Sequence, residues 1–154
     1  MKTVKKLELR SRRVPVAADS KVDYETPVRE PRDAASIAAA LLDGEEQEVF
    51  LAFPLDVKNR VLGYVEVARG SVDSVGVDPR TVFRTAVLLG ASAVIVVHNH
   101  PSGDPTPSAE DIALTGRLVD AGKILGIPVL DHVIVAGERT LSFAEKSMLR
   151  GSGR

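Results

Sequence analysis

The chain of 154 residues has the length of one globular domain, and its 44% hydrophobic and 27% charged residues are typical of a protein with an ordinary packed core. Twenty Lys and Arg against 21 Asp and Glu leave a net charge of −1, so no overall field attracts nucleic acid or an anionic membrane. The absence of cysteine excludes disulfides, thiol catalysis and thiolate metal sites, and leaves His, Asp and Glu as the strong metal ligands.

Residues 1–31 are predicted to form a basic, extended N-terminal arm. The first 32 residues hold nine Lys and Arg against five Asp and Glu, an excess of +4, together with three prolines and few large apolar residues. A solvated tail explains this composition, and contact with nucleic acid or a protein partner is the alternative. Because no apolar run has the length of a signal peptide or of a membrane span, we expect a cytoplasmic protein without a membrane partner.

From residue 31 onward the sequence predicts helices and strands in alternation. Apolar periodicity, capping residues and glycine stops predict helices at 33–42, 78–90 and 108–125. Apolar runs rich in β-branched residues predict strands at 48–55, 60–67, 93–97, 129–135 and 140–143, the first two forming a hairpin around a turn at 56–59. This order implies an α/β domain over residues 32–154, with a mixed central β-sheet flanked by helices.

The most informative residues follow the predicted strand 93–97. His98 and His100 are two residues apart, so at the end of a strand their imidazoles point to the same side, where one metal ion can bind both. Asp111 precedes Leu114 by three residues in the next helix, which puts its carboxylate beside the apolar stripe. Two imidazoles and one carboxylate leave a tetrahedral metal one open position, the arrangement of a catalytic zinc site.

Each of these residues also has a purely structural interpretation. The two histidines can be hydrogen-bonded groups at a strand end, and Ser108 and Asp111 stand at capping-box spacing. Thr106-Pro107 offers a rival helix start, however, with proline in the first helical position. Capping also leaves unexplained the two upstream histidines and the stiff seven-residue loop before Ser108, which contains three prolines.

Residues 98–111 follow the pattern H-x-H, seven residues, Ser, two residues and Asp. This spacing matches the metal motif of the JAB/JAMM (MPN-plus) metalloproteases. The string His-Asn-His-Pro-Ser-Gly resembles the bacterial RadC branch of that family. The middle residue, Asn99, fits the RadC branch, whereas the deubiquitinating members have Ser or Thr there. Four further segments resemble RadC in order: Glu48-Val49-Phe50-Leu51, Arg69-Gly70-Ser71, Val77-Asp78-Pro79-Arg80 and Leu130-Asp131-His132-Val133-Ile134-Val135. The resemblance covers residues 32–148, or 117 of 154, and implies a JAB/MPN-type, cytidine-deaminase-like α/β fold.

The resemblance implies a zinc-dependent hydrolase of JAMM type that cleaves a peptide or isopeptide bond. It implies His98, His100 and Asp111 as the Zn²⁺ ligands. It implies Glu48 as the base that takes a proton from the metal-activated water and delivers it to the leaving amine. Ser108 is implied as the donor of a hydrogen bond to the oxyanion. The expected partner is a peptide or protein substrate, a ubiquitin-like conjugate among them.

Several polar residues keep two interpretations. Glu48 alternates with apolar residues on its strand and can face inward, or it is a solvated charge at the strand entrance, with Glu66 as the spare candidate for the base. His132 fits either a core histidine bonded to backbone or a functional residue, which would lie behind the site or contact the substrate. Arg80 fits either a surface residue or one with a contact elsewhere, because a cation in the first turn opposes the helix dipole.

Two other classes of function stay open. The first is a DNA-repair or mobile-element accessory protein that binds nucleic acid or a protein partner through the basic arm. The second is a metal-dependent nuclease, which a mononuclear site fits poorly. The string H-N-H differs from an HNH nuclease, whose residues are spread over a ββα unit, and the zinc deaminases need two Cys ligands that this chain lacks.

Overall fold

The structure, a computed structural model, describes Val4, Arg10, residues 12–13, residues 25–70 and residues 77–153. Most of the predicted arm over residues 1–31 lies outside these described residues, so its extended conformation stays a prediction. No helix among the described residues is both long and apolar enough to cross a bilayer.

The described elements follow the predicted order of helices and strands. They are α1 (Pro31–Leu41), β1 (Val49–Leu55), β2 (Val65–Arg69), α3 (Pro79–Leu88), β3 (Ala93–Asn99), α4 (Ala109–Leu125), β4 (Val129–Ala136) and β5 (Arg139–Ser142). The prediction of an α/β domain with a mixed sheet is confirmed.

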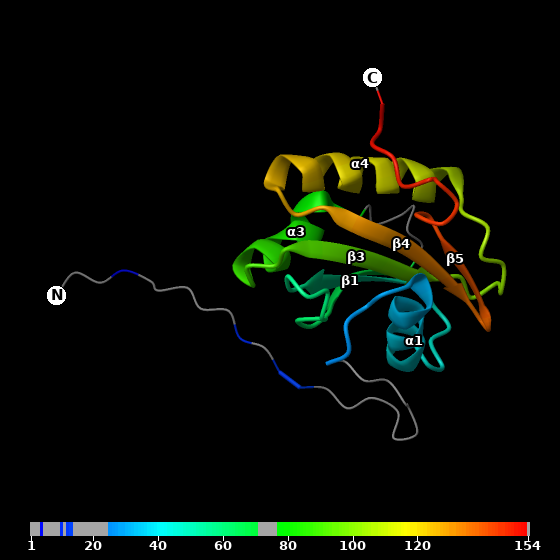
Figure 1. The fold of residues 1–154 in the computed structure, drawn as a ribbon. Coiled ribbons are helices and arrows are strands. Elements are labelled where there is room, and N and C mark those ends of the chain that lie inside the picture. The colour runs from blue at the N-terminus through cyan, green and yellow to red at the C-terminus, as the bar shows by residue number, and fades with distance from the viewer. Residues whose placement is uncertain (1–3, 5–9, 11, 14–24, 71–76, 154) are drawn as a thin grey trace.

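The strands form one five-stranded sheet in the order β2-β1-β3-β4-β5. β1 runs antiparallel to both β2 and β3, β3 runs parallel to β4, and β5 is antiparallel to β4. The parallel pair needs a crossover connection, which α4 provides. Helix α1 covers one face of the sheet, and α3 and α4 cover the other (Figure 1).

Because both faces are covered, every residue of the neighbouring strands β1 and β3 is buried. In β1, Val49, Leu51 and Phe53 pack on the side of α1, and Phe50 and Ala52 pack on the side of α3 and α4. This two-sided burial is the physical reason for the continuous apolar runs in the sequence. It also means that a polar side chain in these strands needs a partner within the protein.

The predicted hairpin forms, but its second strand begins at Val65 rather than at Arg60. The Asp56 carboxylate accepts hydrogen bonds from the backbone N–H groups of Lys58 and Arg60, at 2.8 and 3.0 Å, and so holds the turn. Val61 then makes one isolated bridge to Leu55, and the Leu62 N–H donates to the carbonyl oxygen of Pro54 at 2.9 Å, but residues 62–64 lie outside any strand and β2 starts only at Val65. The apolar, β-branched residues of 60–67 did not reveal this interruption.

Candidate metal centre

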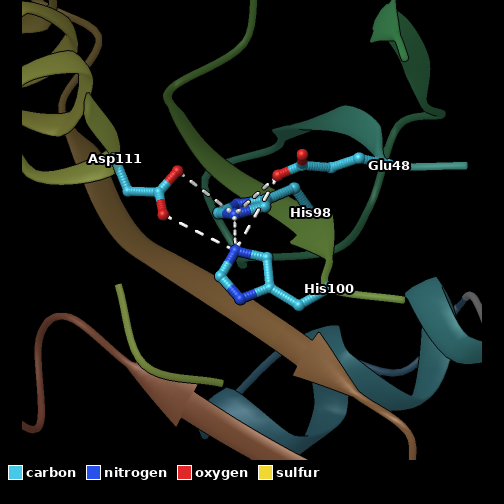
Figure 2. Close-up of side chains that lie close together, drawn as sticks. All are labelled: Glu48, His98, His100 and Asp111. Atoms are coloured by element: carbon cyan, nitrogen blue, oxygen red, sulfur yellow. Dashed lines mark hydrogen bonds and ion pairs between the residues drawn. The ribbon is translucent and has the colours of Figure 1, made fainter. Parts of the chain in front are cut away.

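Four of the predicted site residues come together at one end of the sheet. His98 lies near the end of β3, His100 directly follows that strand, and Asp111 lies in the first turn of α4. Glu48 immediately precedes β1, which runs antiparallel to β3 with Phe50 paired to His98. The antiparallel register therefore brings the start of one strand beside the end of the other, although 50 residues separate them in sequence. Figure 2 shows the four side chains pointing toward a common centre.

The polar atoms of these side chains are close enough to share one ion. One ligand atom from each residue lies within 4.8 Å of the others. The two Nε2 atoms of His98 and His100 are 2.9 Å apart, and the Asp111 carboxylate oxygens lie 3.3 and 3.5 Å from them. Glu48 Oε1 is 3.6 Å from His98 Nε2 and 3.8 Å from His100 Nε2 (Figure 2).

The site has a buried side and a partly open side. The side chains of His98 and Asp111 are 0% and 2% exposed, whereas those of His100 and Glu48 are 15% and 24% exposed. Burial raises the pKa of the Asp111 carboxyl, but hydrogen bonding and charge from His98, with hydrogen bonds from Ser108, outweigh burial and leave this pKa well below its usual range. Asp111 is therefore an anion at neutral pH.

The N-terminus of α4 fixes the orientation of Asp111. Ser108 is the N-cap, and its hydroxyl oxygen accepts a hydrogen bond from the Asp111 N–H at 3.0 Å. In return, Asp111 Oδ2 accepts a hydrogen bond from the Ser108 N–H at 2.8 Å. The capping box thus leaves Oδ1 of the carboxylate toward His98, so capping and a ligand role are compatible. The helix begins after Ser108, not at the rival Thr106-Pro107 start.

His100 directs its Nε2 atom to the centre. Its Nδ1 lies 2.7 Å from the main-chain carbonyl oxygen of Asp104, which can only accept a hydrogen bond. Nδ1 therefore carries a proton, and Nε2, which faces His98 and Asp111, is the nitrogen that can bind an ion. Nitrogen and carboxylate oxygen donors that converge in this way are the donor set of a zinc site, so the residues fit this ion.

Asn99, between the two histidines, is a site residue whose role the sequence did not reveal. Its side chain is buried and points away from the centre, because alternate residues of a strand face opposite ways. The Asn99 Oδ1 atom accepts from the N–H of Val49 at 2.7 Å, and Nδ2 donates to the carbonyl oxygen of Gln47 at 2.9 Å. These two residues flank Glu48, so Asn99 fixes the backbone that carries the candidate base. In the sequence, Asn99 stood out only as the middle residue of the motif, because the predicted strand 93–97 ended before it.

His132 and Thr115 lie directly behind His98. His132 belongs to β4, is fully buried, and places Nε2 2.8 Å from His98 Nδ1. Its Nδ1 lies 2.6 Å from Thr115 Oγ1, and Thr115 belongs to α4. Burial, and then the charge of His98, lowers the pKa of His132 well below its usual value, so this ring is neutral. The ring of His132 thus contacts side chains behind the site, which is the second of the two interpretations. No feature of the sequence singled out Thr115.

The other candidate residues lie away from the centre. Glu66, the spare candidate for the base, is exposed on β2 and pairs with Arg69 at 2.9 Å. Arg80 is 90% exposed and pairs with Asp78 at 2.6 Å, which is the surface interpretation of that residue. Among the described residues, the candidate metal-binding group contains Glu48 and not Glu66.

Comparison with known proteins identifies the family. The RadC-like JAB domain family matches residues 28–148. A UPF0758 protein of Moorella thermoacetica is 47% identical over 124 residues, which cover 80% of this chain and 54% of the relative. The UPF0758 proteins of Pelobacter propionicus and Desulforamulus reducens are 54% and 41% identical over 67% and 93% of this chain, and over 45% and 61% of their own lengths. The chain spans about half the length of these curated relatives. It belongs to the RadC-like JAB domain family.

Proposed function

We propose that the chain is a zinc-dependent metallohydrolase of JAMM type that cleaves a peptide or isopeptide bond. One observation carries the proposal: two imidazole nitrogens and a buried carboxylate converge beside a second, partly exposed carboxylate. The first three groups have the chemistry of metal ligands, and the fourth has the chemistry of a proton carrier.

His98, His100 and Asp111 would hold the zinc ion. Three protein ligands are the number that a catalytic zinc site uses, since the fourth position must be open for water or substrate. The ion, when bound, supplies a Lewis acid that makes water a nucleophile near neutral pH and polarises the carbonyl group under attack.

Glu48 would act as the general base and then as the general acid. Its carboxylate is 24% exposed and lies within 4 Å of both imidazoles, so it can reach a water molecule at the centre and still exchange protons with the substrate. Oε1 would take a proton from the attacking water and give it to the leaving amine. The Asn99 hydrogen bonds on both sides of Glu48 support this role, because they fix the start of its side chain.

Ser108 would stabilise the oxyanion. Its hydroxyl oxygen accepts the capping hydrogen bond from the Asp111 N–H, and a bound substrate carbonyl would compete with the Asp111 carboxylate for the hydroxyl proton. The residue is exposed at the start of α4, beside one of the proposed ligands. A donor in this place can bind the carbonyl oxygen as it gains negative charge.

The substrate class is a peptide or protein, with ubiquitin-like conjugates as the first group to test. The zinc-loaded chain should be incubated with a panel of linear peptides and isopeptide-linked conjugates, and cleavage should be followed by mass spectrometry. Cleavage by wild type that Glu48→Gln abolishes would support the proposal. If zinc-loaded wild type cleaves nothing in a broad panel, the accessory role through the basic residues 1–32 becomes the better proposal.

A further inference from the structure

A chain of three buried hydrogen bonds runs from one proposed ligand to the backbone of another. His98 Nδ1 is 2.8 Å from His132 Nε2, and His132 Nδ1 is 2.6 Å from Thr115 Oγ1. Thr115 Oγ1 is in turn 2.6 Å from the main-chain carbonyl oxygen of Asp111. Exposure of the three side chains is 0%, 0% and 1%, so solvent does not compete for these hydrogen bonds. These hydrogen bonds link β3, β4 and α4.

The far end of this chain fixes the direction of every hydrogen bond in it. A carbonyl oxygen can only accept, so the single hydroxyl proton of Thr115 must point to the Asp111 carbonyl. Thr115 Oγ1 then has only lone pairs for His132, so His132 Nδ1 must carry a proton. The reverse arrangement would leave two oxygen atoms in contact at 2.6 Å with no proton between them.

The same logic passes from His132 to His98. A neutral imidazole with its proton on Nδ1 has a lone pair on Nε2, and this lone pair accepts the proton of His98 Nδ1. Packing holds both rings in this orientation: His98 stacks on Phe50 with an interplanar angle of 13°, and His132 stacks on Phe143 with an angle of 17°. His98 Nδ1 therefore carries a proton, and Nε2, which faces His100 at 2.9 Å and Asp111 at 3.3 Å, is the nitrogen left to bind an ion.

We propose that Thr115 and His132 are positioning residues that hold His98 in the Nδ1-protonated tautomer and so keep its Nε2 free for the metal ion. The purpose of this arrangement rests on the proposed metal centre, whereas the tautomer itself is a property of the metal-free protein. The arrangement works against the local carboxylates. Asp111 Oδ1, 3.3 Å from His98 Nε2, would otherwise favour a proton on that nitrogen.

His100 obtains the same tautomer in a simpler way. Its Nδ1 donates to the carbonyl oxygen of Asp104, four residues away in its own loop. His98 has no such carbonyl partner at Nδ1, and its tautomer depends instead on side chains from two other elements. Substitution of Thr115 therefore reaches His98 and leaves the His100 hydrogen bond in place. It also removes the hydrogen bond to the Asp111 carbonyl, so the tautomer is read separately from zinc affinity.

The test compares Thr115→Val with Thr115→Ser in the full chain. Valine keeps the shape but removes the only acceptor of His132 Nδ1, so His132 moves its proton to Nε2 and His98 must carry its own on Nε2. Zinc affinity, measured by competition with a chelating dye, should fall about 10- to 100-fold, the usual effect of losing a residue that orients a ligand. Serine keeps the hydroxyl and should restore wild-type affinity.

A direct reading of the tautomer keeps the test independent of metal binding. Long-range ¹H–¹⁵N NMR of metal-free wild type at about pH 8.5, where a free imidazole is neutral, should show the His98 proton on Nδ1. Thr115→Val should show it on Nε2. Ser142→Ala removes another buried hydroxyl, bonded to Asp131 at 2.6 Å and outside this chain, and should change neither zinc affinity nor the His98 signals.

A wild-type His98 proton on Nε2, or zinc binding by Thr115→Val as tight as that of wild type, would overturn the proposal. If Thr115→Val does not fold, the NMR measurement on wild type still decides the tautomer. If wild type shows the expected tautomer but binds no zinc, the metal centre is wrong and the assignment of the hydrogen-bond chain stands. Zinc binding without peptide cleavage would contradict the hydrolase and leave the positioning role intact.

Discussion

The two sides of the candidate metal centre are built in different ways. On the buried side, His98 and Asp111 are held by hydrogen bonds to His132, Thr115 and Ser108. On the open side, His100 is tied by one loop carbonyl, and the carboxylate of Glu48 has only the two imidazoles as ion-pair partners among the described residues. Under the proposed function, the buried side would orient the ligands, and the open side would exchange protons and contact the substrate.

This division follows from where each side originates. The buried side comes from the central strands β3 and β4 and the first turns of α4, which are covered by the rest of the fold. The open side comes from the residue before β1 and from the loop after β3. Changes on the buried side should therefore affect metal binding, and changes on the open side should affect reaction rate.

The largest expected effect is the loss of the ion from the buried side. His98→Ala and Asp111→Ala each remove one of three ligands, so the near-stoichiometric zinc expected in wild type should fall to a small fraction. Elemental analysis of protein purified without added metal measures this directly. Glu66→Gln changes a surface carboxylate paired with Arg69 and is the matched control that should keep its zinc. Equal zinc content in wild type and all three variants would show that His98 and Asp111 are not zinc ligands.

The next effect concerns the open side alone. Glu48→Gln keeps the shape of the side chain and removes the proton acceptor, so hydrolysis of any accepted peptide should fall about 10²- to 10⁴-fold while zinc content stays unchanged. Glu66→Gln should leave the rate within a few-fold. If Glu48→Gln keeps the wild-type rate and Glu66→Gln loses it, the base is misassigned.

Ser108 lies at the boundary between the two sides, and its two roles can be separated. Ser108→Ala should lose about 10²- to 10³-fold in rate through the oxyanion and about 1 kcal/mol of unfolding free energy through the helix cap. Ser108→Asn preserves a capping acceptor, so it should recover most of the stability. Rates and thermal melts measured on the same samples give both numbers. A rate in Ser108→Ala equal to that of wild type would leave Ser108 with the capping role only.

The smallest effect is on the backbone that carries the base. Asn99→Ala leaves the buried N–H of Val49 without its side-chain acceptor, so the free energy of unfolding should fall by about 1–3 kcal/mol. Denaturant titration measures the change. Zinc affinity should stay near that of wild type, because Asn99 faces away from the ligands. A variant as stable as wild type would show that the two hydrogen bonds of Asn99 do not fix the start of β1.

Local signals in the sequence predicted the order of the elements and the residues that gather at the centre. Because β1 and β3 are buried on both faces, they appear in the sequence as apolar runs. His98, His100 and Asp111 are close in sequence because they belong to one strand-loop-helix unit. The family resemblance favoured Glu48 over Glu66, but only the register of β1 against β3 shows Glu48 beside the histidines, and this register cannot be seen in the sequence.

The hydrogen bonds around the centre were beyond sequence reasoning for the same reason. Thr115 reaches His132 across 17 residues, His132 reaches His98 across 34, and Asn99 reaches Val49 across 50. None of these pairs shares a periodic pattern, because each joins residues from different elements. The start of β2 was misplaced because the apolar, β-branched run begins before the residues that pair with β1.

The most direct test of the central claim is anomalous diffraction at the zinc edge from crystals of the full chain grown with zinc. The account predicts one anomalous peak per chain, within coordination distance of His98 Nε2, His100 Nε2 and the Asp111 carboxylate, with Glu48 beside it and not bound. No peak at this position, or a peak held by other residues while these four side chains keep only their mutual contacts, would contradict it.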